Sequence, residues 1–322
     1  MVFNMWKLVF LSFVTIFLFS CIKEKAIVLN FTEIQLPTDL DLNDVYVEND
    51  SIIWIAAGKR FGRGAVFYSP DFGINWNKVL DYDHEIKSLR FKNGRIYAIS
   101  IGNTLQWSDD NGQNWSSLIM PGWDYFSAAD FFSDESGLLV GGENFGKGIV
   151  NKVLTGINTA ISDADTLQHE MTDIHILNDS SVIAVGYGVI LRSDNRGQNW
   201  IPDNSRGDFF KAISFPDSIN GFVIGDYGSI YSTSDAGINW KKIKGSNTFF
   251  NNNNRFSDII FINKDYGAVC GRKGLLWISE NSAETWKPVN NLPDVDFNKL
   301  FITQNHLLLA SKAAKLFIVN IP

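Results

Sequence analysis

Three aspartates recur in nearly identical surroundings and are the first candidates for chemistry in this chain. Asp71, Asp110 and Asp235 each follow a Ser or Thr by two residues and precede a Gly by two, and a Trp stands three residues after that Gly. Carboxylates that converge can bind a metal ion or act as general acid and base. A carboxylate can also fold back on nearby backbone N–H groups and close a turn, in which Gly supplies the positive φ. We favour this local use, because the copies lie far apart and each carries its own turn.

Five copies of this motif, which we call the box, run through the chain. They read SPDFGINW from Ser69, SDDNGQNW from Ser108, SDNRGQNW from Ser193, TSDAGINW from Thr233 and SENSAETW from Ser279. In the last copy Asn281 replaces Asp and Ala283 replaces Gly, which predicts a modified turn rather than a lost repeat. A buried indole contributes on the order of 4 to 6 kcal/mol as an upper bound, so we expect each Trp to hold neighbouring layers together. The box residues with this structural role are Ser69, Asp71, Gly73, Trp76, Ser108, Asp110, Gly112, Trp115, Ser193, Gly197, Trp200, Thr233, Asp235, Gly237, Trp240, Ser279 and Trp286.

The spacing of the boxes predicts the architecture. Successive box tryptophans lie 39, 85, 40 and 46 residues apart, so one repeat lacks its box. Periods of about 40 to 50 residues with short strands and Gly-rich turns are typical of a β-propeller with four strands per blade. We therefore predict an all-β, seven-bladed β-propeller of four-stranded blades; six or eight blades are the alternatives if the boxless third repeat is misread. The expected blades span residues 41–80, 84–119, 125–165, 170–203, 208–243, 254–289 and 296–322.

The last predicted blade supplies only three strands before the chain ends. The missing outer strand is available at the other end of the chain, where residues 25–37, KAIVLNFTEIQLP, have no neighbouring strand of their own. Pairing this segment with the last blade would close the ring and remove two exposed sheet edges. We expect residues 26–322 to form one propeller domain and the protein to be a monomer.

The first residues read as an export signal. Lys7 ends a short N-terminal region, and the run from Leu8 to Phe19 is apolar but too short for the roughly 20 residues of a membrane span. The run leads into Leu18-Phe19-Ser20-Cys21, which resembles a bacterial lipoprotein box. We expect residues 1–20 to be a lipoprotein signal peptide, Cys21 to be lipidated and residues 21–25 to be a tether. The protein would then be exported and anchored in the bacterial cell envelope, on its periplasmic side or at the cell surface; an uncleaved anchor or an ordinary signal peptide are the alternatives.

Composition excludes several classes of function. The net charge of −7 argues against broad binding to nucleic acid, which depends on neutralising phosphates with Lys and Arg. The two cysteines, Cys21 and Cys270, lie in unlike surroundings and do not suggest a disulfide framework. Four scattered histidines show no metal-ligand spacing, so we expect no metal and no cofactor.

The box is similar to the Asp-box, or BNR repeat, of sialidases and sortilin-type receptors. The longer units GYGVILRSDNRGQNW and GDYGSIYSTSDAGINW resemble the repeat of the photosystem II stability/assembly factor family. This resemblance covers most of residues 40–290. It implies a non-enzymatic seven-bladed propeller that docks on membrane-associated proteins.

Binding residues are expected where the turns between second and third strands meet the linkers between blades. On that face, blades six, seven and one contribute cations, which we call the basic crescent, while the other blades contribute neutral or mixed turns with acids such as Glu143 and Asp226. The crescent could attract an acidic segment of an envelope protein or an anionic glycan or head group, although lysines in surface turns are also simply solvated. Linker aromatics such as Tyr125 and Phe209 could add contacts or pack between blades, and Trp123 is the one expected to be most exposed. The crescent consists of Lys59, Arg60, Arg63, Arg272, Lys273, Lys312 and Lys315.

Enzymatic alternatives have weaker signals. A sialidase would be expected to carry an Arg-Ile-Pro motif, and the nearest string is Arg95-Ile96-Tyr97 inside a predicted strand. A glycoside hydrolase with a pair of carboxyl groups leaves no fixed sequence signature, so this alternative stays open. We therefore expect a binding propeller without catalysis, with a glycan-active enzyme as the second hypothesis.

Overall fold

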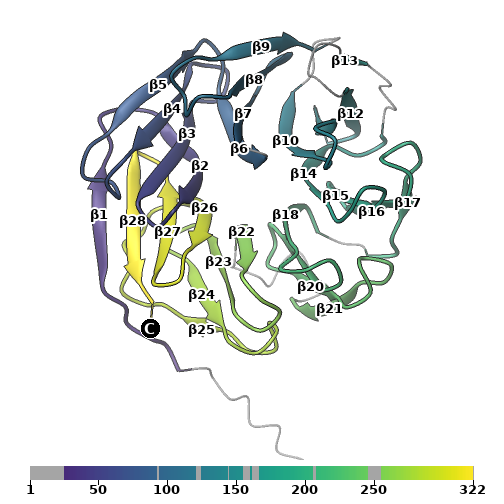
Figure 1. The fold of residues 1–322 in the computed structure, drawn as a ribbon. Helices are drawn as coiled ribbons and strands as arrows, with labels where there is room; N and C mark the ends of the chain where they lie inside the picture. Colours follow the sequence, from purple (N-terminus) through teal and green to yellow (C-terminus); the bar gives the residue numbers. More distant parts are fainter. Residues whose placement is uncertain are drawn as a thin grey trace, which may run out of the picture.

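The chain folds into a ring of seven antiparallel four-stranded sheets, shown in Figure 1. The computed structural model describes residues 25–92, 94–120, 125–143, 145–154, 160–161, 167–205, 208–245 and 255–321. Within these ranges no helix has the length and apolar character needed to cross a membrane. The predicted seven-bladed β-propeller is confirmed.

Blades 1 to 6 are each built from consecutive strands, starting at the inner strand beside the central channel. Blade 1 contains β2 (Asp41–Glu48), β3 (Ile52–Gly58), β4 (Gly64–Ser69) and β5 (Asn77–Tyr82). Blade 2 contains β6 (Ile86–Lys92), β7 (Arg95–Ser100), β8 (Thr104–Ser108) and β9 (Ser116–Ile119). Blade 3 contains β10 (Phe126–Phe131), β11 (Gly137–Glu143), β12 (Lys147–Val153) and β13 (Ala160–Ile161). Blade 4 contains β14 (Met171–Ile176), β15 (Val182–Gly186), β16 (Val189–Ser193) and β17 (Ile201–Pro202). Blade 5 contains β18 (Phe210–Ser214), β19 (Gly221–Gly225), β20 (Ile230–Thr233) and β21 (Lys241–Lys244). Blade 6 contains β22 (Phe256–Phe261), β23 (Gly267–Gly271), β24 (Leu276–Ser279) and β25 (Lys287–Pro288).

Blade 7 joins the two ends of the chain. It contains β26 (Phe297–Ile302), β27 (His306–Ser311), β28 (Lys315–Asn320) and, as its outer strand, β1 (Phe31–Gln35). β1 runs antiparallel to β28, with Phe31 opposite Val319 and Gln35 opposite Lys315. Figure 1 shows the purple and yellow ends of the chain side by side in this blade. The predicted closure by the N-terminal segment is confirmed.

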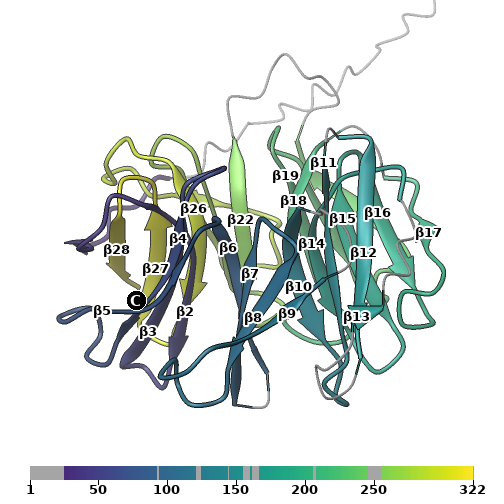
Figure 2. The same cartoon turned by 90° about the horizontal axis from the view of Figure 1, so that it is seen from above.

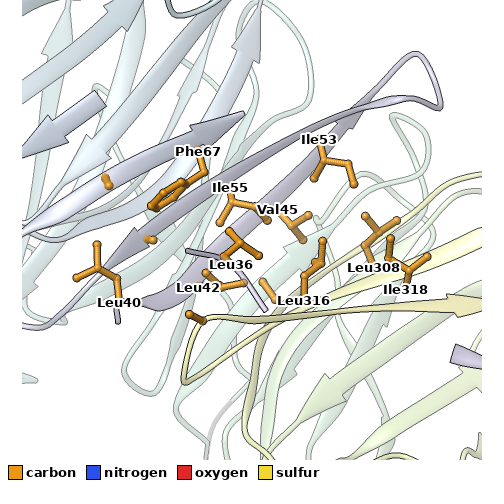
Figure 3. Packing of buried hydrophobic residues seen from close by; sticks show 14 of the residues in the cluster. Leu36, Leu40, Leu42, Val45, Ile53, Ile55, Phe67, Leu308, Leu316 and Ile318 are labelled. Carbon is orange, nitrogen blue, oxygen red and sulfur yellow. The ribbon is translucent and has the colours of Figure 1, made fainter. Parts of the chain in front are cut away.

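Apolar clusters between blades hold the ring together. The cluster in Figure 3 joins blade 1, through Leu42 and Ile55, to blade 7, through Leu308 and Leu316. Trp76 packs against this same cluster, so the first box tryptophan lies at the interface with the preceding blade. The other box tryptophans do the same at their own interfaces, namely Trp115, Trp200, Trp240 and Trp286. These contacts match the expected role of the indoles between layers.

The box turn is closed by its first residue as much as by its acid. The buried Ser69 hydroxyl accepts a hydrogen bond from Gly73 N–H at 2.7 Å, and Asp71 Oδ1 accepts one from Asn75 N–H at 2.8 Å. Two successive residues, Phe72 and Gly73, have positive φ of 55° and 90°. The turn therefore needs a small residue at its second left-handed position.

The two boxes without Asp keep this turn. Asn195 Oδ1 accepts Asn199 N–H at 2.8 Å, and Asn281 Oδ1 accepts Thr285 N–H at 3.0 Å. Ala283 takes the place of Gly with a φ of 63° and donates to Ser279 Oγ at 3.0 Å. The third position of the box therefore needs only an acceptor oxygen, and an amide supplies this as well as a carboxylate does.

Candidate binding site

A cavity of about 690 Å³ occupies one mouth of the central channel. Its lining includes inner-strand residues such as Lys87, turn residues such as Arg60 and Arg272, and linker residues such as Tyr125 and Phe209. The second-to-third-strand turns and the linkers therefore share one face of the ring. Viewed edge-on in Figure 2, the strands of each blade run between the two faces, so each inner strand reaches this mouth.

A ring of seven polar side chains lines the mouth. Every inner strand carries a β-bulge near its start, and the bulged residue lines the cavity in all seven blades. A bulge re-aims the extra side chain, here toward the channel, while the residue before it stays in the blade core. We call these residues the bulge ring: Asn43, Lys87, Ser127, Thr172, Lys211, Ser257 and Asn298.

The bulge ring was not predicted from the sequence, although a signal for it exists. The apolar residue before each ring member recurs every 39 to 46 residues, in the pairs Leu42-Asn43, Ile86-Lys87, Phe126-Ser127, Met171-Thr172, Phe210-Lys211, Phe256-Ser257 and Phe297-Asn298. An apolar residue followed by a polar one is common in any half-buried strand, so only the known blade spacing makes this pattern meaningful.

Deeper in the channel, carboxylates bind the inner strand of the next blade. Asp173 accepts hydrogen bonds from its neighbour Ile174 N–H at 2.9 Å and from Ile213 N–H of blade 5 at 3.0 Å. Asp130 reaches Ile176 N–H of blade 4 at 2.7 Å. Such acids satisfy backbone donors that face the channel, which is a structural task.

Two half-buried cations balance these acids. Arg90 lies 3.3 Å from Asp173, and Lys299 lies 3.0 Å from Asp258. Burial outweighs the opposing effect of the Lys299 ammonium and raises the pKa of Asp258 to about 6. Burial lowers the pKa of Lys299, but the surrounding carboxylates, led by Asp258, outweigh this and raise it. The channel interior is thus an ion-paired network rather than a set of free acids.

The basic crescent is divided in the structure. Arg60, Arg272 and Lys312 line the cavity, whereas Lys59, Arg63, Lys273 and Lys315 are not part of its lining. Lys59 and Arg63 both pair with Asp39, at 2.8 and 2.5 Å, and Lys315 pairs with Glu33 at 2.6 Å. Lys273 donates its backbone N–H to Asp296.

Acids also face two of the three cavity-lining members. Arg272 lies 3.7 Å from Asp226, and Lys312 lies 3.0 Å from Asp296. These acids weaken the positive field expected from the turns alone. Cys21 and Trp123, the predicted lipidation site and exposed aromatic residue, lie outside the described residues.

Aromatic side chains also lie at the rim. Phe61 and Phe145 are 73% and 54% exposed, and Tyr187 is 45% exposed, so these rings face solvent rather than a blade core. Linker residues Tyr125 and Phe209 join them, while their neighbours Phe126 and Phe210 are buried between blades. The linker aromatics were predicted as candidate contacts, but the three turn aromatics were not. A single aromatic residue in a Gly-rich turn gives no sequence signal of its exposure.

Other reactive groups give no sign of chemistry. Cys270 is buried in β23, and burial raises the pKa of its thiol, which makes it an apolar core residue rather than a nucleophile. Among the residues that the structure describes, no group of three or more His, Cys, Asp and Glu side chains could hold a metal ion.

Fold and repeat together define an Asp-box β-propeller. Residues 205–296 match the family model described as photosynthesis system II assembly factor YCF48. The resemblance seen in the repeat is therefore supported by an independent comparison of this part of the chain. No curated protein matches the chain in a sequence search.

Solved structures share the fold. YCF48 from Cyanidioschyzon merolae is 14% identical, with a TM-score of 0.68 over 90% of this chain and 98% of the other. A structure of YCF48 bound to D1 peptide is 18% identical, with a TM-score of 0.70 over 93% and 98% of the two chains. Virginiamycin B lyase from Staphylococcus aureus is 10% identical, with a TM-score of 0.67 over 91% and 99%. At such identities the likeness concerns the fold alone, which serves both binding proteins and enzymes.

Proposed function

We propose that this protein is a non-enzymatic binding propeller that takes a segment of a partner protein at the mouth of its central channel. The observation that carries this proposal is the convergence of exposed aromatic and cationic side chains from several blades on one cavity. Aromatic residues and Arg are enriched at the energetic centres of protein interfaces. The YCF48 structure that holds a D1 peptide supports a peptide as the ligand class, since it has the same fold.

Three carboxylates of the cavity, Asp44, Asp173 and Asp296, do not favour a glycan-active enzyme. A glycoside hydrolase needs two carboxyl groups about 5 to 9.5 Å apart that are free to move protons or attack the sugar. Asp44 and Asp173 each accept two backbone N–H groups, and Asp296 binds Lys312. These acids are already engaged in holding the ring, which supports the binding function.

The propeller is displayed on the bacterial cell envelope through a lipid on Cys21. The apolar run before Cys21 and its position in the lipoprotein-like box support this anchor. Metabolic labelling with a fatty-acid analogue should mark the wild-type protein and not Cys21→Ser. Label that persists in the variant would contradict the anchor and leave the binding function untouched.

Charge reversal tests the binding face. Crosslinking in intact cells, followed by purification from envelope membranes, should recover a specific partner with the wild-type protein. The combined variant Arg60→Glu, Arg272→Glu and Lys312→Glu should lose most of this product, because all three residues line the cavity. Lys241→Glu is the matched control, since Lys241 is an exposed residue on the outer strand β21. Equal recovery with the triple variant and the control would contradict the proposed face.

A further inference from the structure

We propose that the mouth recognises a partner segment in which an acidic side chain lies next to an aromatic one, with Lys211 binding the carboxylate. This inference rests on the proposed function and names the chemistry of its ligand. The aromatic side chain packs on the exposed cluster of Phe145, Tyr187 and Phe209, which we call the aromatic cup.

Lys211 is the first observation. Most other cations of the cavity form ion pairs with acids. The pairs are Lys87 with Glu85, Arg90 with Asp173, Arg272 with Asp226, Lys299 with Asp258, and Lys312 with Asp296. Among the described cavity residues, Lys211 and Arg60 are the cations without such an ion pair. Each of the two instead faces an aromatic ring.

The ammonium of Lys211 lies 3.9 Å from the ring centroid of Phe209. Burial lowers the pKa of Lys211 below its ordinary value, and the carboxylate of Asp226 opposes this shift without cancelling it. Asp226 is already shared by Arg255, at 2.5 Å, and Arg272. The Lys211 ammonium is therefore partly desolvated and has no acid within ion-pair distance. A ligand carboxylate could form a charge-assisted hydrogen bond with it, and such bonds are stronger away from water.

The aromatic cup is the second observation. Its rings come from the turn of blade 3, the turn of blade 4 and the linker into blade 5, with centroids 5.0 Å apart for Phe145 and Tyr187 and 5.4 Å for Tyr187 and Phe209. Their planes are inclined by 39° and 69°, and Phe145 meets Phe209 at 86°. The three rings therefore pack against one another at steep angles and do not form the flat platform on which a sugar face would stack, and edge-to-face packing on them suits a further aromatic side chain.

Phe209 links the two subsites. Because it forms one wall of the cup and also lies beneath the Lys211 ammonium, the ring and the carboxylate of a ligand must be close together. Residues i and i+2 of an extended peptide point to the same face and lie about 6.6 Å apart along the chain, which satisfies this condition. Arg60, 5.0 Å from the centroid of Phe61, offers a second cation over an aromatic ring for a flanking acid.

A random peptide display library, screened against the immobilised full-length protein, tests the inference. We expect the retained peptides to carry Asp or Glu within about two residues of Phe, Tyr or Trp. For one such peptide, Lys211→Met should weaken binding about tenfold, and replacing the acid of the peptide by its amide should do the same. Combining both changes should add no further loss, because the two groups interact with each other. Lys211→Arg should retain binding.

Several controls separate the outcomes. Phe145→Ser should also weaken binding, and its high exposure makes a folding defect an unsuitable explanation. Lys241→Met should have no effect. If peptides bind at the mouth but lack acids, or if Lys211→Met leaves their affinity unchanged, this inference is wrong and the proposed function stands. If the wild-type protein retains no peptide at all, the proposed function fails as well.

Discussion

The carboxylate of Asp44, on the inner strand of blade 1, accepts a hydrogen bond from the backbone N–H of Leu89 on the inner strand of blade 2, at 2.8 Å. The other oxygen of Asp44 accepts Val45 N–H, also at 2.8 Å. One buried acid therefore satisfies two backbone donors and ties two blades together. Asp258 extends the arrangement to Leu300 of blade 7 at 3.0 Å.

Removing such a clamp should destabilise the ring. Asp44→Ala leaves two buried backbone N–H groups without an acceptor, at about 1 to 3 kcal/mol each before relaxation, so we expect a loss of about 2 to 4 kcal/mol in the free energy of unfolding. Urea denaturation at neutral pH measures this loss. Asp81→Ala, an exposed acid on β5, should change stability by less than about 0.5 kcal/mol. Similar losses in both variants would show that Asp44 is not a clamp.

Much of this architecture was accessible from sequence because the repeat is local. The box needs a hydroxyl, an acceptor and a residue tolerant of positive φ within eight positions, so its spacing counts the blades directly. The N-terminal strand followed from counting strands, since the last blade lacked one. The clamps escaped prediction because Asp44 and Leu89 are 45 residues apart, and nothing in either local sequence indicates the other.

The candidate site was predicted only in part, for a similar reason. The turns and linkers were correctly expected to share a face, but cations were assigned to it without the acids that come from other segments. Asp39 precedes β2 and neutralises Lys59 and Arg63, while Asp226 of blade 5 reaches Arg272 of blade 6. Charge on a turn can be read from sequence, whereas the pairing of that charge depends on which segments meet.

The box turn should tolerate an amide in place of its acid. Asp110 Oδ1 accepts Asn114 N–H at 2.8 Å, the bond that Asn195 makes in another box at the same length. We therefore expect Asp110→Asn to retain nearly all stability at neutral pH. Ser108→Ala should cost about 1 to 2 kcal/mol, because the buried hydroxyl accepts Gly112 N–H and donates to Asp110. Thermal unfolding at neutral pH compares the variants, and a larger loss for Asp110→Asn than for Ser108→Ala would contradict this view of the turn.

Acid should distinguish the same variant. Hydrogen bonds from Asn114, side chain first and then backbone, lower the pKa of Asp110 despite a small opposing effect of desolvation. A lowered pKa stabilises the folded protein above the unfolded value of about 3.9, and that contribution disappears as pH falls through the folded pKa. Stability measured between about pH 5 and about pH 2 should therefore fall less steeply for Asp110→Asn than for the wild type. Parallel curves would count against a lowered pKa at Asp110.

The N-terminal strand should be needed to close the ring. Deleting the chain through Gln35 removes β1 and exposes the edge of β28, whose residues Leu316 and Phe317 are fully buried in the closed ring. An unpaired apolar edge strand pairs with other chains, so we expect oligomers and a lower unfolding midpoint. Light scattering after size-exclusion chromatography measures the first effect. A protein that begins at Lys25 retains β1 and should remain unchanged; a monomeric, equally stable deletion variant would refute this role of β1.

A histidine between blades 4 and 5 should make the ring sensitive to mild acid. His175 of β14 stacks on Phe215 of blade 5, with centroids 5.2 Å apart, and desolvation lowers its pKa. The unfolded chain then takes up a proton at about pH 6.5 while the folded protein still resists it, so stability is lost as pH falls below that value. Asp258, with its pKa raised to about 6, acts in the opposite direction between about pH 6 and about pH 4, because it gains its proton in the folded state first.

Comparing the wild type with His175→Gln separates the two effects, since Asp258 is common to both proteins. On going from about pH 7.5 to about pH 5.5, the free energy of unfolding from urea titrations should fall further for the wild type than for the variant. The variant will be less stable at the higher pH, because Gln cannot stack on Phe215 as an imidazole ring does. A pH-dependent loss of the same size in both proteins would mean that His175 titrates alike in the folded and unfolded chain, and the channel would then owe its acid response to its carboxylates alone.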